Sequence, residues 1–163
     1  MSSQLIFDFN AKSDLSDWYV VDDGVMGGRS DGNFKLNKEG HGEYSGDVSL
    51  ENNGGFSSLR FYCGKLDLTG KEKFVLHIKG DGKSYQFRAK KNARDYFSYV
   101  LSVKTSGEWE TIEIPFEEMY PSFRGRTLDG ANFSDGQLEE IGILIGNKKE
   151  ESFKLLIDKI SVE

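Results

Sequence analysis

Four arginines have the side chains best suited to bind a ligand in this sequence. A guanidinium group is planar and always charged, and its fork of N–H donors matches a carboxylate or a phosphate at two points. Arg60 and Arg88 fall on strand positions opposite the most apolar ones, and Arg124 and Arg126 flank Gly125 in a long loop. If all four meet on one sheet face or rim, we expect a patch that binds a protein partner, an anionic group or a sugar.

Aromatic and acidic residues complete the candidate binding set. The rings expected near the arginines are Trp18, Tyr85, Tyr96 and Phe123, and the Gly-rich stretch 18–32 adds Asp22, Asp23, Met26 and Arg29. A second interpretation stays open, in which Arg124 or Arg126 pairs internally with one of the two aspartates and holds the loops together. Structural ion pairs and ligand-binding arginines look alike in a sequence.

Metal and nucleotide sites have little support. Asp22 and Asp23 precede Gly24, but the alternating acidic pattern of a calcium loop is absent, so we expect these carboxylates to cap turns or to pair with an arginine. Neither GVMGG nor GDG matches a nucleotide-binding fingerprint. We expect no metal, no cofactor and no nucleotide.

Catalytic groups do not form a recognisable pattern either. His41, His77 and Cys63 lack the neighbours of a nucleophilic site, and we expect them to serve surface or strand packing. Four acidic residues outside the Gly-rich stretch are expected to be solvated: Glu117, Glu118, Glu139 and Glu140. The sequence therefore predicts a protein that binds without catalysis.

Length, charge and hydropathy restrict the class of protein and its partners. The chain has 163 residues, which predicts one domain over 1–163, and its net charge of −6 argues against a nucleic-acid or membrane-surface binder. The amino terminus lacks a signal or transit pattern, and we find no apolar run long enough to cross a membrane. A single cysteine fits a reducing compartment. We expect a cytoplasmic protein without membrane insertion.

Alternating apolar residues predict an all-β fold of nine to ten short strands in a two-sheet antiparallel β-sandwich. Runs 74–79 and 85–90, joined by GDGKS, are typical of a β-hairpin. We expect loops over 64–72 and 116–137, the latter with a helical turn at FEEMY. Apolar residues change parity within 153–162, which indicates a bulge or burial on both faces.

Four motifs stand in one order along the chain: WYVVDDGVMGGRS (18–30), NNGGFSSLRF (52–61), GDGKSYQFR (80–88) and IPFEEMYPSFRGR (114–126). Together they resemble the complex I intermediate-associated protein family, whose mitochondrial members are assembly factors for respiratory complex I. The residues that match the family's motifs are Asp23, Met26, Gly27, Gly28, Ser30, Gly54, Gly55, Phe56, Gly80, Asp81, Gly82, Tyr85, Pro115, Phe116, Phe123, Arg124, Gly125 and Arg126.

The resemblance implies a galactose-binding-like jelly roll and a binding, assembly-factor or chaperone role. Its implied partner is a protein such as a respiratory-complex subunit or an assembly intermediate. Because the chain lacks a transit peptide and an extension beyond the domain, we expect a free-standing bacterial member. Two alternatives stay open: a carbohydrate-binding module, since sandwiches of this kind often hold sugars, and an enzyme of unrecognised chemistry.

Overall fold

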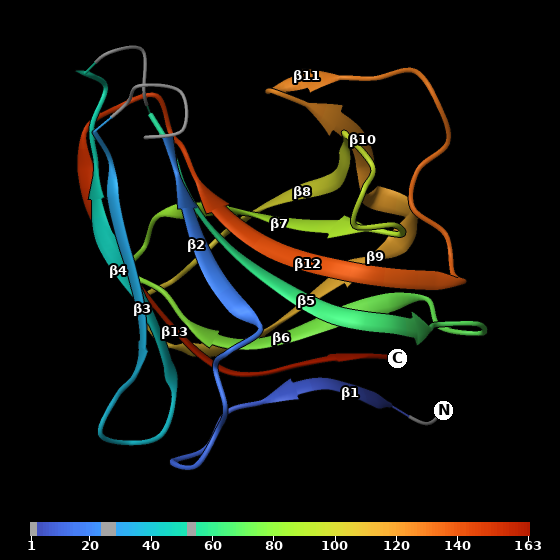
Figure 1. Cartoon of the computed structure of the whole chain (residues 1–163), viewed down its shortest axis with the longest axis horizontal. Coiled ribbons are helices and arrows are strands. Elements are labelled where there is room, and N and C mark those ends of the chain that lie inside the picture. The colour runs from blue at the N-terminus through green and yellow to red at the C-terminus, as the bar shows by residue number, and fades with distance from the viewer. Residues whose placement is uncertain (1–2, 24–28, 52–54) are drawn as a thin grey trace.

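Two antiparallel β-sheets form the molecule (Figure 1). The computed structural model describes residues 3–23, 29–51 and 55–163. A six-stranded sheet has the order β3 (Asp31–Leu36), β4 (Gly42–Val48), β13 (Glu151–Val162), β6 (Lys73–Lys79) and β9 (Trp109–Pro115), and β1 (Gln4–Asp8) pairs with β13. A seven-stranded sheet has the order β11 (Arg126–Thr127), β10 (Tyr120–Phe123), β8 (Ser98–Lys104), β7 (Ser84–Lys90), β12 (Gln137–Ile145), β5 (Ser57–Asp67) and β2 (Trp18–Asp22). This arrangement confirms the predicted all-β, two-sheet antiparallel fold.

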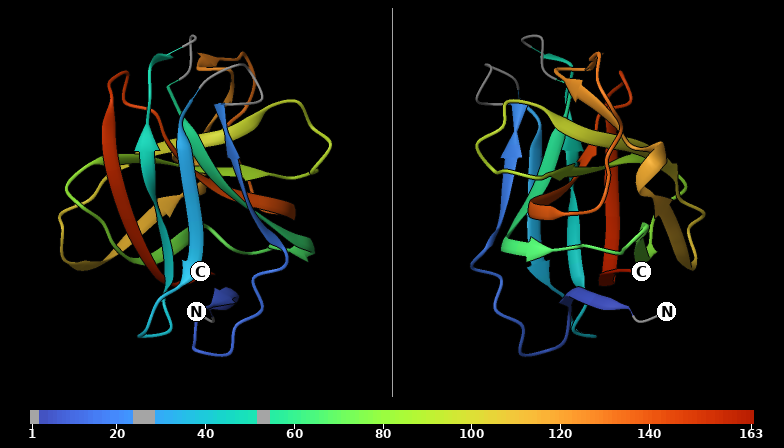
Figure 2. Two further views of the ribbon diagram at one scale, coloured as in Figure 1. Left: turned by 60° about the vertical axis from the view of Figure 1, so that its left-hand side comes forward. Right: turned by 90° about the vertical axis from the view of Figure 1, so that its right-hand side faces the viewer.

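The core lies between the two sheets, where alternate residues of each strand face inward. Strand β7 shows the pattern: Tyr85, Phe87 and Ala89 are buried, and the residues between them point to the other face. Aromatic rings fill one end of the core, where Trp18 stacks on Phe61 with centroids 4.5 Å apart. The first and last strands lie side by side, because β1 pairs with the last residues of β13 (Figure 2).

The predicted hairpin over 74–90 is wrong. Strands β6 and β7 belong to different sheets, and the GDGKS segment carries the chain from one sheet to the other. Asp81 holds this crossing, since its carboxylate accepts hydrogen bonds from the Tyr85 hydroxyl at 3.0 Å and the Lys154 amide at 2.8 Å. An Asp-Gly pair signals a turn, but it does not determine which strand the chain joins next.

Two expected loops contain strands. Strand β5 continues through residues 64–67, where it pairs with the start of β12, so the loop predicted over 64–72 begins later. The stretch 116–137 contains the predicted helical turn as η3 (Phe116–Glu118), but it also contains β10 and β11. A positive φ at Arg124 (50°) and Gly125 (79°) closes these two strands into a tight turn.

The bulge indicated near the end of the chain is present. The register of β13 against β6 shifts between Ile157 and Lys159. Leu155 and Ile157 are buried before the shift, and Ile160 and Val162 are buried after it. One extra residue therefore moves the apolar side chains of β13 to the other parity while the same face stays in the core.

Candidate binding site on the seven-stranded sheet

The outward face of the seven-stranded sheet carries an open hollow of about 570 Å³. Strand β2 forms one edge of this sheet and β10 and β11 lie at the other, with the central strands β5, β12 and β7 between them (Figure 1). The residues that line it include Arg60, Gln86, Arg88, Lys90, Tyr96, Ser98, Phe123, Arg124 and Glu140. Arg60 and Arg88 thus lie where the parity of their strands predicted, on the face opposite the core.

All four of the sequence motifs reach this hollow. Val21 comes from the stretch 18–30, Arg60 from 52–61, Arg88 from 80–88, and Phe123 and Arg124 from 114–126. Pairing of β2 with β5, of β5 and β7 with β12, and of β10 with β8 brings these distant segments together. The motifs therefore share one surface of the molecule.

Arg60 and Arg88 lie on either side of Gly142. This glycine of β12 is the register partner of Arg60 on β5 and of Arg88 on β7. Since adjacent strands lie about 4.8 Å apart, the two arginine backbones are separated by roughly 10 Å, with no side chain between them. A Cβ at Gly142 would lie 2.9 Å from the Leu59 carbonyl oxygen, so the glycine is required by close packing.

Arg88 is a desolvated cation without an acidic partner at contact distance. Burial is the main cause that lowers its pKa to about 10, followed by the positive charge of Arg60, while Glu140 partly opposes both. One Nη donates a hydrogen bond to Gln86 Oε1 at 2.8 Å. Within the described residues, neither Arg88 nor Arg60 forms a salt bridge.

Glu139 and Glu140 are buried, so their predicted solvation is wrong. A register shift between Leu138 and Glu140 lies at this point of β12, and both carboxylates find hydrogen-bond donors. Glu140 accepts a hydrogen bond from the Tyr19 hydroxyl at 2.9 Å, and Glu139 accepts one from the Ala93 amide at 3.2 Å. Burial, followed by the hydrogen bond to Glu140, raises the pKa of Tyr19. Sequence reasoning missed this tyrosine and Glu140 because their pairing depends on register.

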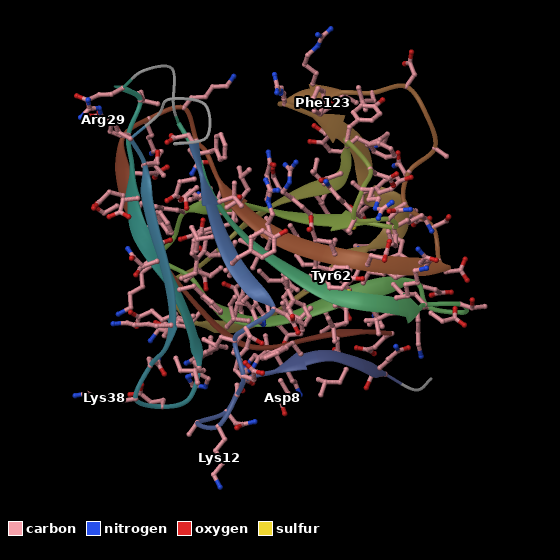
Figure 3. All side chains as sticks on the ribbon, viewed as in Figure 1. Asp8, Lys12, Arg29, Lys38, Tyr62 and Phe123 are labelled. Atoms are coloured by element: carbon pink, nitrogen blue, oxygen red, sulfur yellow. The ribbon has the colours of Figure 1, made fainter. Side chains whose placement is uncertain are left out.

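Two aromatic rings form the rim of the hollow. Tyr96 is 67% exposed and meets Phe123 edge to face at 5.2 Å between centroids. Arg124 lies over the Phe123 ring at 5.2 Å. Figure 3 shows Phe123 at one end of the molecule, far from Lys12 at the other. Arg126 is exposed on β11 and does not line the hollow, so only three of the four predicted arginines meet there.

Trp18 and Tyr85 belong to the core and not to the binding surface. Trp18 is 7% and Tyr85 2% exposed, because both occupy inward positions of their strands. Arg29 is exposed and lies 3.8 Å from Glu51. Met26 and the motif glycines Gly27, Gly28 and Gly54 lie outside the described residues.

Of the two aspartates of the first motif, Asp23 accepts hydrogen bonds from amides outside the strands, as a turn cap would, whereas Asp22 joins strands β3 and β5. Asp23 is fully buried and accepts hydrogen bonds from the amides of Ser30, Gly55 and Phe56 at 2.9, 2.6 and 3.2 Å. Asp22 accepts hydrogen bonds from the Gly32 amide and the Ser57 hydroxyl. No described ion pair joins either aspartate to Arg124 or Arg126, so the internal brace predicted as an alternative is wrong.

The histidines lie on the six-stranded sheet, away from the hollow. His41 and His77 both contact the Trp109 ring, at 4.6 and 5.2 Å between centroids, and His77 Nδ1 lies 2.6 Å from Asp158. This is the strand packing that the sequence predicted. Burial raises the pKa of the Cys63 thiol to about 12, so the thiol is protonated at neutral pH. In the described part of the chain, His, Cys, Asp and Glu form no group suited to a metal ion.

A family model described as complex I intermediate-associated protein 30 (CIA30) matches residues 7–157. The chain belongs to the CIA30 family. Complex I intermediate-associated protein 30, mitochondrial, of Mus musculus is 26% identical over 98% of this chain, and that of Drosophila melanogaster is 25% identical over 99%. The chain spans 56% and 63% of the length of these two CIA30 proteins.

Solved structures similar to this CIA30 family member include carbohydrate-binding modules and parts of agarases. A family 11 module from Clostridium thermocellum, in complex with a β-1,3-1,4-mixed-linked tetrasaccharide, has a TM-score of 0.70 at 20% identity and covers 98% of this chain and 94% of its own. A family 29 module complexed with cellulohexaose has a TM-score of 0.59 at 11% identity, covering 99% and 89%. At such identity the likeness establishes the fold alone, which is the predicted jelly-roll β-sandwich. The described residues contain no helix that is both long and apolar enough to span a bilayer.

Proposed function

We propose that this protein is a non-catalytic binding domain of the assembly-factor type, which recognises a protein partner through the hollow of its seven-stranded sheet. The observation that carries the proposal is the convergence of all four family motifs on that hollow, from Val21 at one edge to Phe123 at the other. Exposed aromatic rings beside arginines are the residue types that dominate protein interfaces.

The partner we propose is a respiratory-complex subunit or an assembly intermediate, as the name of the CIA30 family suggests. Membership of the family supports binding without chemical change. The cytoplasmic location expected from the sequence stays a prediction.

A site-specific photo-crosslinker tests this proposal. With p-benzoylphenylalanine in place of Tyr96, on the rim, irradiation in cells of the native host should give one discrete protein adduct of defined mass. The control carries the same group in place of Leu5, which is 54% exposed on β1 of the other sheet. The proposal fails if both positions give the same adducts, or if Tyr96 gives none.

A sugar ligand is the second candidate function. It is favoured by the likeness of the fold to modules in complex with glucan oligosaccharides, and by the rim rings Tyr96 and Phe123, which offer faces for stacking. Affinity electrophoresis in a gel that contains β-1,3-1,4-mixed-linked glucan separates the two functions. Retardation that Tyr96→Ala abolishes would favour the sugar, whereas unchanged mobility supports the protein partner.

A further inference from the structure

The hollow is positively charged in an acidic chain. Four basic side chains and one carboxylate line it, namely Arg60, Arg88, Lys90, Arg124 and Glu140, whereas the whole chain has a net charge of −6. Positive charge gathered on one concave surface attracts an anionic group to that surface. A long polyanion would also meet the negative remainder of the molecule, so a short acidic segment fits this charge distribution better.

Glu140, the carboxylate among these lining residues, acts on Arg88 and Lys90 through space and not by a salt bridge. Glu140 accepts the Tyr19 hydroxyl at 2.9 Å and is not within salt-bridge distance of a described arginine. The Lys90 ammonium group donates to the Asp95 carbonyl at 2.8 Å. Arg60 and Arg88 are left as the charged donors of the hollow floor with no carboxylate partner among the described residues.

Desolvating a guanidinium group without an anion costs free energy, and a bound carboxylate would recover part of that cost. Gly142 adds no side chain between the two strands that carry Arg60 and Arg88, so none stands between the two arginines at this register position. Both arginines line the hollow, and side chains whose backbones lie about 10 Å apart are long enough to share one ligand. The rim rings Tyr96 and Phe123 extend the same surface with apolar contact area.

We propose that Arg60 and Arg88 form an anion site over Gly142 that takes the side-chain carboxylates of an acidic segment of the protein partner. This inference rests on the proposed function, since it names the chemistry by which the same hollow recognises that partner. The guanidinium donors bind the carboxylate, and the aromatic rim contacts the residues that flank it.

NMR titration of the ¹⁵N-labelled full chain tests the site with three probes: N-acetyl hexaglutamate amide, the matching hexaglutamine peptide, and inorganic phosphate. Hexaglutamate should shift the Nε–Hε signals of Arg60 and Arg88 and the amide signal of Gly142, while hexaglutamine should shift none of them. If hexaglutamate moves none of these signals, the proposed site is wrong. If phosphate binds there and hexaglutamate does not, the choice of a carboxylate as the ligand is wrong.

Charge variants complete the experiment. Arg60→Gln and Arg88→Gln should each weaken hexaglutamate binding at least fivefold, and Lys12→Gln, which removes the same charge from an exposed position at the opposite end, should leave it unchanged (Figure 3). Equal weakening by all three variants would overturn the site. If Arg88→Gln does not fold, Arg88→Lys keeps the charge but loses the fork, and unchanged affinity for that variant would contradict bidentate binding.

The outcomes of the two proposals can be told apart. Should hexaglutamate fail to bind while the crosslinker at Tyr96 still captures one partner, the anion site is wrong and the proposed function stands. Should hexaglutamate bind at Arg60 and Arg88 while the crosslinker captures nothing, the anion site stands and the protein-partner function is wrong.

Discussion

Asp23 is a single residue that connects distant parts of the chain. Its buried carboxylate accepts hydrogen bonds from Ser30, seven residues away, and from the amides of Gly55 and Phe56. Burial would raise its pKa, but these hydrogen bonds together outweigh burial and lower the pKa below the ordinary value. The ionised form is therefore the one that the folded protein stabilises.

Asp23→Asn should destabilise the protein by about 2 kcal/mol at pH 7, because the variant loses the charge and gives its amide N–H group no acceptor. The pKa of Asp23 is lower in the folded than in the unfolded state, where it is about 3.9. The stabilisation is thus complete above that value and is lost as the pH falls through the folded pKa. Urea unfolding at pH 7 and pH 3 should show a smaller difference between wild type and variant at pH 3. An equal difference at both would contradict this role.

Unlike the Asp23 carboxylate, the Arg88 charge contributes little to the free energy of unfolding. Arg88→Met keeps much of the apolar stem of the side chain but removes a desolvated charge that has no carboxylate partner. We therefore expect the free energy of unfolding to stay the same or rise by about 1 kcal/mol. Chemical denaturation measures this change. Arg29→Met, at an exposed position, is the matched control and should change stability by less than about 0.5 kcal/mol. A loss above 1 kcal/mol for Arg88→Met would indicate a structural role.

Sequence patterns predicted the position of some of these residues on the sheet but not of others. The alternation of Tyr85, Phe87 and Ala89 placed Arg88 on the outward face, because a strand has a period of two. Glu140 could not be placed in this way, since its burial depends on a register shift and on a donor from β2, 121 residues away in sequence. Local periodicity carries no information on either.

At the level of strands, β12 determines whether the site exists. It lies between β5 and β7, and its Gly142 has no room for a side chain. Most strands were recognisable from alternation, but the assignment of strands to sheets was not. The chain leaves β6 at Gly80 and changes sheet, and a Cβ at Gly80 would lie 2.2 Å from the Thr105 Cβ. Such long-range contacts have no local sequence signal.

Gly142→Ala should destabilise the protein by about 2 kcal/mol, because the new methyl group would lie 2.9 Å from the Leu59 carbonyl oxygen and the two strands must separate to admit it. Urea unfolding with an unchanged m-value would report the loss as a lower midpoint. A loss below about 0.5 kcal/mol would mean that β5 and β12 have more freedom than the packing suggests.

In the molecule as a whole, the β-sandwich brings together segments that lie far apart in the sequence. The motifs were visible in the sequence, and the resemblance they carried was correct, but their meeting on one hollow follows only from the strand order of the seven-stranded sheet. Arg126, Trp18 and Tyr85 carry motif or aromatic signals as strong as those of Phe123, yet lie outside the hollow. Sequence alone did not separate the residues that build the sheet from those that line its outer face.

The affinity of the captured partner for rim variants tests the central claim most directly. Calorimetry with the purified partner would compare wild type, the double variant Tyr96→Ala/Phe123→Ala, and Leu5→Ala on the other sheet. We predict that the double variant binds at least tenfold more weakly, since buried aromatic residues dominate interface energies, and that Leu5→Ala binds like wild type. Equal affinity for all three proteins would contradict recognition through this hollow.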